Sequence, residues 1–228
     1  FGSILDSHLE SFSNSVQKVG KSIVDGTLAI HREMASRFLP SAVKFHYNFN
    51  MRDLAAVFQG LCSIHHSHVR DGLKVARLWM HECERVYADR LISNTEIQRC
   101  IEIIVDVAKR VIDDDQEALF KQPNAWTTFA TQTMDDSRAY LPIKSMASLK
   151  KVFHDQLNEY NEANAIMNLV LFDMAMLHVV RIARIIGFPQ GNALLVGVGG
   201  SGKQSLARLA SFICGNTVTQ VAVTSTFG

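Results

Sequence analysis

Seven residues towards the C-terminal end of the chain have the types and spacing that a phosphate-binding loop needs. Gly197-Val198-Gly199-Gly200-Ser201-Gly202-Lys203 matches the pattern G-x-x-x-x-G-K. Glycines let successive backbone N–H groups turn towards phosphate oxygens without obstruction by a Cβ atom. A helix that begins near Gly202 would add a dipole favourable to anions, and Lys203 would bring a full positive charge to the β- and γ-phosphates. The motif therefore predicts a nucleotide site for ATP or ADP.

The motif departs from the rule at its last position, where Ser or Thr normally ligates Mg²⁺. Gln204 stands there, and Ser205 comes one residue later. One residue along a helix turns the side chain by about 100°, so Ser205 is a poor direct substitute. The chain also has no carboxylate after Asp173, whereas hydrolysis needs one for Mg²⁺ and one to position water. We therefore expect nucleotide binding, question Mg²⁺ ligation by this chain, and expect no complete catalytic site.

The segments around the loop read as the start of a parallel sheet. Residues 193–198 form an apolar run of strand length before the glycines, and residues 217–225 read as a second strand. Between them, helical spacing returns at Leu206, Leu209, Ala210 and Ile213. Strand, glycine-rich turn, helix and strand make a βαβ unit, which belongs to a parallel sheet.

The residues before Pro123 show helical spacing instead. One apolar stripe of a surface helix runs through Ile97, Ile101, Ile104, Ala108 and Val111. Thr95 stands where an N-cap would, and three consecutive aspartates at 113–115 stop the pattern. Further helices are predicted over residues 51–64 and 73–91 and over much of the first forty residues.

A second helical region follows the irregular stretch between Pro123 and Pro142. It runs from about Ser148 to Ile186, with a predicted break near residues 161–164. Residues 167–180 are apolar all round and predicted to be buried, with Met167, Met174 and Met176 filling a core. The irregular stretch is the best candidate for a domain boundary, and we place the two domains at residues 1–127 and 128–228.

Composition and charge exclude several classes of protein. With 23 Lys+Arg against 22 Asp+Glu, the net charge of +1 gives no reason to expect a nucleic-acid or membrane partner. The longest uncharged apolar-rich stretch, residues 163–172, is far too short to span a membrane. The four cysteines contain no C-x-x-C pair, which is typical of a reducing, cytoplasmic setting. Because the chain opens at Phe1, we expect it to be an excerpt from a longer protein.

Two further clusters carry chemistry-bearing residue types but favour structural interpretations. Cys62, His65, His66 and His68 resemble metal ligands, but no second cluster accompanies them, so a solvated turn is favoured over a metal site. The run His81-Glu82-Cys83-Glu84 with Arg85 and Arg90 is typical of a helix face with charge pairing.

Several long strings resemble axonemal dynein heavy chains, whose ring consists of AAA+ modules. The strings that resemble the start of the fourth module are Tyr160-Asn161-Glu162-Ala163, residues 167–172 and residues 191–206, which include the phosphate loop. Those that resemble the helical lid of the third module are Phe49-Asn50-Met51-Arg52-Asp53-Leu54, Phe58-Gln59-Gly60 and residues 78–90. Gln204 belongs to the axonemal pattern at this module.

The resemblance implies a fold class and a set of partners. The expected fold is α/β overall: a mostly helical AAA+ lid subdomain, followed by the start of a P-loop parallel-sheet AAA+ large subdomain. The implied partners are the other AAA+ modules of the same heavy chain, dynein intermediate and light chains, and microtubules through parts outside this chain. The implied location is the axoneme of a cilium or flagellum. By analogy, Arg52 is the lid arginine that reaches the nucleotide of the preceding module.

Three functions remain open at this point. The first is an ATP-binding, regulatory segment of an ATP-hydrolysing microtubule motor. The second is a structural ring module that does not hydrolyse nucleotide. The third, a small P-loop kinase or transferase, is disfavoured because a long helical region precedes the loop. For Arg52 the alternative role is an ordinary surface ion pair with Asp53 or another acid.

Overall fold

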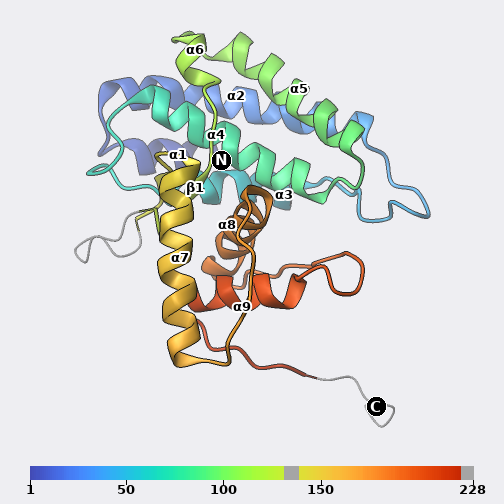
Figure 1. Cartoon of the computed structure of the whole chain (residues 1–228). Coiled ribbons are helices and arrows are strands. Elements are labelled where there is room, and N and C mark those ends of the chain that lie inside the picture. The colour runs from blue at the N-terminus through green and yellow to red at the C-terminus, as the bar shows by residue number, and fades with distance from the viewer. Residues whose placement is uncertain (131–138, 222–228) are drawn as a thin grey trace. The chain divides into compact units, whose positions relative to one another are not determined.

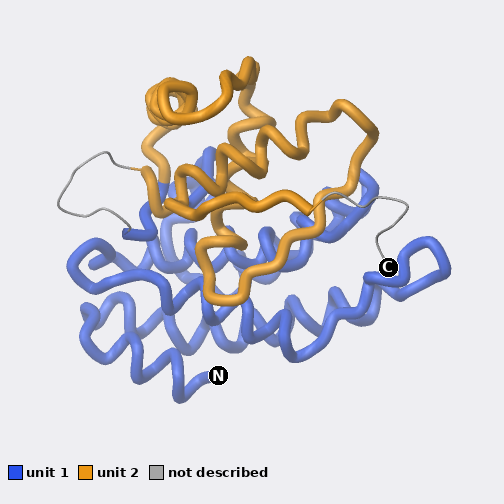
Figure 2. The backbone as a smooth tube through the Cα atoms, turned by 90° about the horizontal axis from the view of Figure 1, so that it is seen from below, with its two compact units in different colours: residues 1–126, 139–142 blue, residues 127–138, 143–228 orange. Residues whose placement is uncertain are grey.

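The chain folds into two compact units, which are drawn in different colours in Figure 2. The structure, a computed structural model, describes residues 1–130 and 139–221. The first unit comprises residues 1–126 and 139–142, and the second comprises residues 127–138 and 143–228.

The first unit is a helical body, as the sequence predicted (Figure 1). Its helices are α1 (Gly2–Leu9), α2 (Asn14–Arg37), α3 (Met51–Leu61), α4 (Gly72–Tyr87), the 3₁₀ turn η1 (Ala88–Arg90), α5 (Asn94–Val111) and α6 (Gln116–Leu119). The predicted helices at 51–64, 73–91 and 97–111 are thus confirmed, apart from their ends. Two short strands, β1 (Trp126–Thr127) and β2 (Leu141–Pro142), pair with each other in the stretch predicted to be irregular.

The N-cap of α5 is Ser93, so the prediction of Thr95 is wrong. An N-cap residue needs extended backbone and a side-chain oxygen that reaches the amide three residues on. Ser93 has φ −111° and ψ 143°, and its Oγ accepts from the backbone N–H of Glu96 at 3.2 Å. Thr95 already lies inside the helix, where its hydroxyl cannot perform this role.

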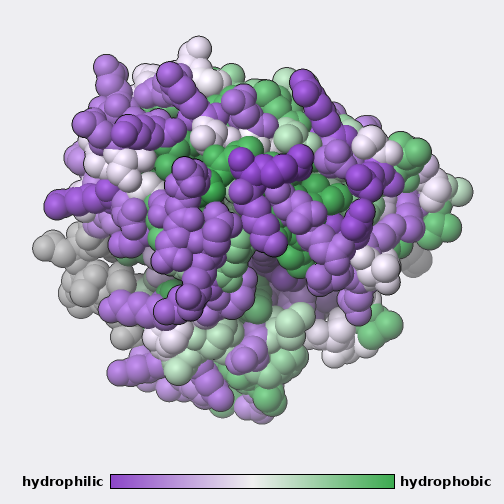
Figure 3. Space-filling view, turned by 90° about the horizontal axis from the view of Figure 1, so that it is seen from above, coloured by the Kyte–Doolittle hydropathy of each residue, from purple (hydrophilic) through white to green (hydrophobic). Residues whose placement is uncertain are grey.

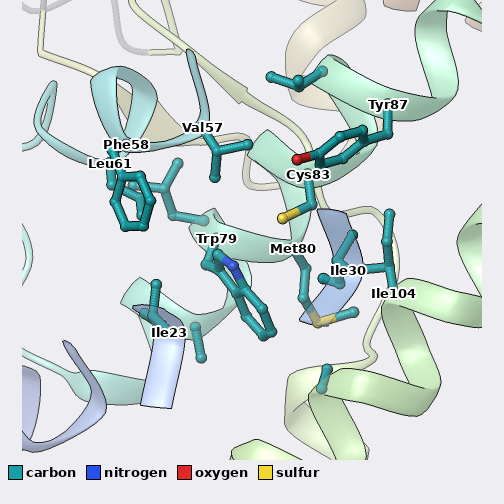
Figure 4. Packing of buried hydrophobic residues seen from close by; sticks show 14 of the residues in the cluster. Ile23, Ile30, Val57, Phe58, Leu61, Trp79, Met80, Cys83, Tyr87 and Ile104 are labelled. Carbon is teal, nitrogen blue, oxygen red and sulfur yellow. The ribbon is translucent and has the colours of Figure 1, made fainter. Parts of the chain in front are cut away.

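The core of the first unit forms around Trp79 on α4 (Figure 4). The Trp79 indole is fully buried and donates from Nε1 to Thr27 Oγ1 at 2.8 Å, which satisfies its one polar group. Side chains from α2, α3 and α5 surround α4 in this core, among them Ile23, Ile30, Val57, Phe58, Leu61 and Ile104. Burial also raises the pKa of the Cys83 thiol well above its ordinary value, so this cysteine stays protonated and acts as an apolar side chain.

The face of the molecule in Figure 3 is mostly hydrophilic, with hydrophobic side chains visible only in breaks between polar ones. This agrees with the amphipathic pattern of α5, whose buried residues include Cys100, Ile103, Ile104 and Val107. None of the helices within residues 1–130 and 139–221 is long and apolar enough to cross a membrane.

The helix face at residues 81–84, for which charge pairing was predicted, is largely buried. His81 and Glu82 are 1% and 0% exposed, and Glu82 Oε1 accepts from the Tyr140 hydroxyl at 2.7 Å. Arg85 pairs with Glu84 at 3.2 Å and with Asp89 at 3.5 Å, so the predicted charge pairing is confirmed. The segments after α6 and around β2 cover this face, which the spacing along α4 alone does not indicate.

The second unit contains α7 (Met146–Ala163), α8 (Asp173–Gly187) and α9 (Lys203–Ile213), which pack against one another. The predicted break near residues 161–164 is confirmed by the end of α7 at Ala163. The prediction that residues 167–180 are a wholly buried helix is wrong. Residues 167–172 precede α8, and Val170, Phe172 and Met174 are 77%, 59% and 53% exposed, although Met176 is fully buried.

The predicted strand at residues 193–198 is not formed. Among the described residues only β1 and β2 pair as strands, and Leu194 and Val196 are 86% and 87% exposed. A strand requires a hydrogen-bonded neighbour, and a continuous apolar run also requires cover on both faces. The second predicted strand lies partly outside the described residues, and its described part, residues 217–221, is not in a strand.

Candidate nucleotide site

The glycine-rich loop takes its shape from two residues in the left-handed region. Gly200 has φ +75° and Gly202 has φ +78°, a conformation that side chains with a Cβ rarely adopt. Gly202 is also the N-cap of α9, and its carbonyl accepts from Leu206 N–H at 2.9 Å to start the helix. The glycine spacing of the motif therefore places a sharp turn directly before a helix N-terminus.

The space beside three of the loop glycines is open. A Cβ added to Gly199, Gly200 or Gly202 would meet no atom within 4 Å, whereas at Gly197 it would meet Ser201 Oγ at 3.2 Å. Open space next to the backbone is what an anion needs in order to approach the N–H groups of the loop. These residues fit a phosphate group on this ground.

Lys203 lies over the loop that it follows. Its Nζ donates to the carbonyl oxygens of Gly197 and Val198, both at 2.7 Å, and to Ser201 Oγ at 3.1 Å. The Lys203 ammonium is therefore held by the carbonyl oxygens of the loop. The backbone N–H groups at the start of α9 have no acceptor within the helix. The ammonium needs only to exchange these neutral acceptors for phosphate oxygens, with which a charge-assisted contact is stronger.

The side chains at the start of α9 fit Mg²⁺ poorly, because Gln204 stands where a hydroxyl normally ligates the metal. Gln204 is exposed and Ser205 is half-buried on the first turn of α9. No group of three or more His, Cys, Asp or Glu side chains that could hold a metal ion occurs in residues 1–130 and 139–221. This finding covers Cys62, His65, His66 and His68 as well, whose region is a turn with exposed His65 and His66.

Arg52 lies in the first turn of α3, in the other unit. Its backbone N–H donates to the Oδ1 of the N-cap Asn50 at 2.9 Å, and its side chain is exposed. The described residues contain no ion pair of the Arg52 guanidinium. Asp53 pairs with Arg90 instead, at 2.5 Å, so the alternative interpretation of Arg52 as a partner of Asp53 is wrong.

Sequence reasoning missed the Asp53–Arg90 pair, although the sequence does indicate the capping role of Asp53. An Asn followed three residues later by Asp, directly before an apolar run, is typical of a capping box, and Asn50 and Asp53 form one. The partner Arg90 lies 37 residues along the chain, at the end of a different helix, and no local pattern indicates that contact.

Comparison with known proteins agrees with both units. Residues 23–122 match the profile of the AAA+ lid domain, and residues 167–228 match that of the P-loop containing dynein motor region D4. The flagellar outer-arm dynein beta chain of Chlamydomonas reinhardtii is 50% identical over 99% of this chain. The chain belongs to the dynein heavy-chain family.

Other dynein relatives are similar over the whole segment. The ciliary dynein beta chain of Heliocidaris crassispina is 47% identical, and the human dynein axonemal heavy chain 17 is 44% identical, each over 100% of this chain. The chain spans only 5% of the length of each of these three relatives. It thus corresponds to a short AAA+ region of axonemal heavy chains, in agreement with the predicted α/β class.

Proposed function

We propose that this dynein segment binds the phosphates of ATP or ADP on residues 197–205 as part of the AAA+ ring of an axonemal microtubule motor. The observation that carries the proposal is the loop geometry, in which open glycines precede α9 and Lys203 bridges the loop carbonyls. Binding would use the backbone N–H groups of Gly199 to Lys203 and the Lys203 ammonium.

The site is proposed to bind nucleotide better than it hydrolyses it. Mg²⁺ would supply positive charge against the phosphates if it were bound, but this chain presents Gln204 where the metal-ligating hydroxyl normally stands. The Gln204 amide can donate an N–H to a phosphate oxygen, which holds the ground state and the transition state about equally. Uniform binding of this kind does not accelerate chemistry, so we assign the site a regulatory role.

Arg52 is proposed to act at a different nucleotide, held by the preceding AAA+ module of the heavy chain. Its exposed guanidinium at the start of α3 supports this role, because a planar fork can hold phosphate oxygens bidentately. The further proposed partners are the remaining AAA+ modules, intermediate and light chains, and microtubules through other parts of the heavy chain. The proposed location is the axoneme, from the names of the relatives.

A structural ring module without hydrolysis is the second candidate. The Gln204 position favours it for this part of the chain. The two candidates differ in whether ATP turnover at this site can be detected at all.

The proposal is tested with Lys203→Ala in a heavy chain that contains this segment and whose other phosphate loops are disabled. Loss of a charge-assisted contact worth about 1.5–3 kcal/mol should weaken ATP binding by about 10- to 150-fold. Lys151→Ala, which removes an exposed lysine from α7, is the matched control and should leave the affinity unchanged. Unchanged affinity in Lys203→Ala would contradict the assignment of the loop as a binding site.

A further inference from the structure

Arg52 has an exposed side chain, but the residues on either side of it are held firmly. Asn50 caps α3 from before it, and Asp53, directly after it, is only 6% exposed. The Asp53 Oδ2 accepts from the backbone N–H of Asn50 at 2.7 Å, which closes the capping box around Met51 and Arg52. The backbone that carries Arg52 is therefore fixed by its two neighbours.

The second oxygen of Asp53 ties this helix start to a distant part of the unit. Asp53 Oδ1 accepts from Arg90 Nη2 at 2.5 Å, and Arg90 Nη1 lies 3.4 Å from Oδ2. Arg90 ends the 3₁₀ turn η1 that follows α4. One carboxylate thus joins the N-terminus of α3 to the end of α4, and its two oxygens perform different roles.

Arg90 also holds the chain that leads into α3. Its Nη1 donates to the Asn48 carbonyl at 3.2 Å, and its guanidinium lies 5.1 Å from the centre of the Phe49 ring. The Arg90 carbonyl in turn lies 3.1 Å from His46 Nε2. A single arginine therefore contacts the segment on both sides of the N-cap, within a few residues of Arg52.

We propose that Asp53 and Arg90 are positioning residues that fix the direction in which α3 presents the Arg52 guanidinium to a bound nucleotide. The inference rests on the proposed role of Arg52 and goes beyond it, because it assigns a function to two residues that touch no ligand. A carboxylate that is shielded from water and joined to a forked guanidinium holds its geometry better than an exposed pair. Neither residue could be replaced by one of similar charge without loss of the fork or the cap.

The test measures ATP affinity at the site that Arg52 reaches, in the full heavy chain with its other nucleotide sites disabled, including Lys203→Ala in this segment. Arg90→Ala and Asp53→Asn should each weaken binding by about 10- to 100-fold, the scale that a displacement of about 1 Å can produce. Arg90→Lys keeps the charge and should show an intermediate loss. Arg99→Ala, which removes an exposed pair with Glu102 on α5, is the matched control.

The deciding measurement is a double-mutant cycle with Arg52→Ala. If Arg90 acts through Arg52, Arg90→Ala should change the affinity by less than about twofold once Arg52 is absent. If Arg90→Ala keeps its full effect on affinity in the Arg52→Ala background, the positioning role is wrong. It is also wrong if Arg52→Ala alone weakens binding but Arg90→Ala alone does not. If Arg52→Ala alone leaves the affinity unchanged, the lid-arginine role is wrong and the positioning role falls with it. Limited proteolysis of each variant heavy chain shows whether the first unit is folded, by whether new cuts appear within residues 1–126. Where Arg90→Ala is not folded, Arg90→Lys takes its place in the cycle.

Discussion

The contact between Gly60 and Glu82 makes a sharp prediction about the stability of the helical unit. A Cβ added at Gly60, on α3, would lie 1.8 Å from Glu82 Oε2 and 2.2 Å from its Cδ, far inside van der Waals contact. Glu82 is fully buried on α4 and accepts from the Tyr140 hydroxyl at 2.7 Å. In Gly60→Ala the Glu82 carboxyl group must therefore move away from a position where it is buried and hydrogen-bonded.

The expected cost combines three contributions. Overpacking a well-filled core costs about 1–3 kcal/mol. Loss of a hydrogen bond to a charged group costs about 1.5–3 kcal/mol, because the displaced carboxylate no longer accepts from Tyr140. The better helix propensity of alanine returns about 1 kcal/mol. We therefore expect Gly60→Ala to lower the free energy of unfolding by about 1.5–5 kcal/mol.

The assay is urea unfolding followed by tryptophan fluorescence. The chain has two tryptophans, Trp79 and Trp126, and both lie buried in the first unit, so the signal reports on this unit alone. Gly2→Ala is the control, because a Cβ there meets no atom within 4 Å. Tyr140→Phe should lose only the hydrogen-bond contribution. The reasoning is refuted if Gly60→Ala unfolds like the wild type, or if it costs as much in a Glu82→Ala background, where the space is free.

Two further predictions concern Gln204 and Glu96. Gln204→Thr restores a hydroxyl where Mg²⁺ is normally ligated. In a heavy chain with the main motor site disabled, it should therefore raise the residual ATPase activity. A wild-type site that already hydrolyses ATP as fast as the main site would contradict this. The hydrogen bond from Lys44 lowers the pKa of Glu96. The ionised Glu96 therefore stabilises the fold above its ordinary pKa of about 4.3, and this stabilisation is lost as pH falls through the lowered pKa. Glu96→Gln should therefore unfold at lower urea than the wild type at pH 7, with the gap closing towards pH 3; a gap that is unchanged by pH would exclude the ion pair as its cause.

The helices of the first unit could be predicted because their signals are local. The stripe from Ile97 to Val111 lies on one side of α5, and the aspartates that follow it end the helix. The position of Glu82 could not be predicted, because its burial depends on Tyr140, 58 residues away. A charged residue on a helix reads as exposed until the segment that covers it is known.

The glycine-rich loop and the apolar run before it show the same division within eleven residues, 193–203. The apolar run at 193–198 has the composition of a strand buried on both faces, but such a strand exists only when neighbouring strands and helices supply hydrogen bonds and cover. Residues 199–203 need no such neighbours. Their turn follows from the left-handed φ angles of Gly200 and Gly202, and the bonds from Lys203 to the Gly197 and Val198 carbonyls close it. The loop therefore keeps its sharp turn although residues 193–198 form no strand, because the turn depends on Gly200, Gly202 and the Lys203 bonds and not on a sheet.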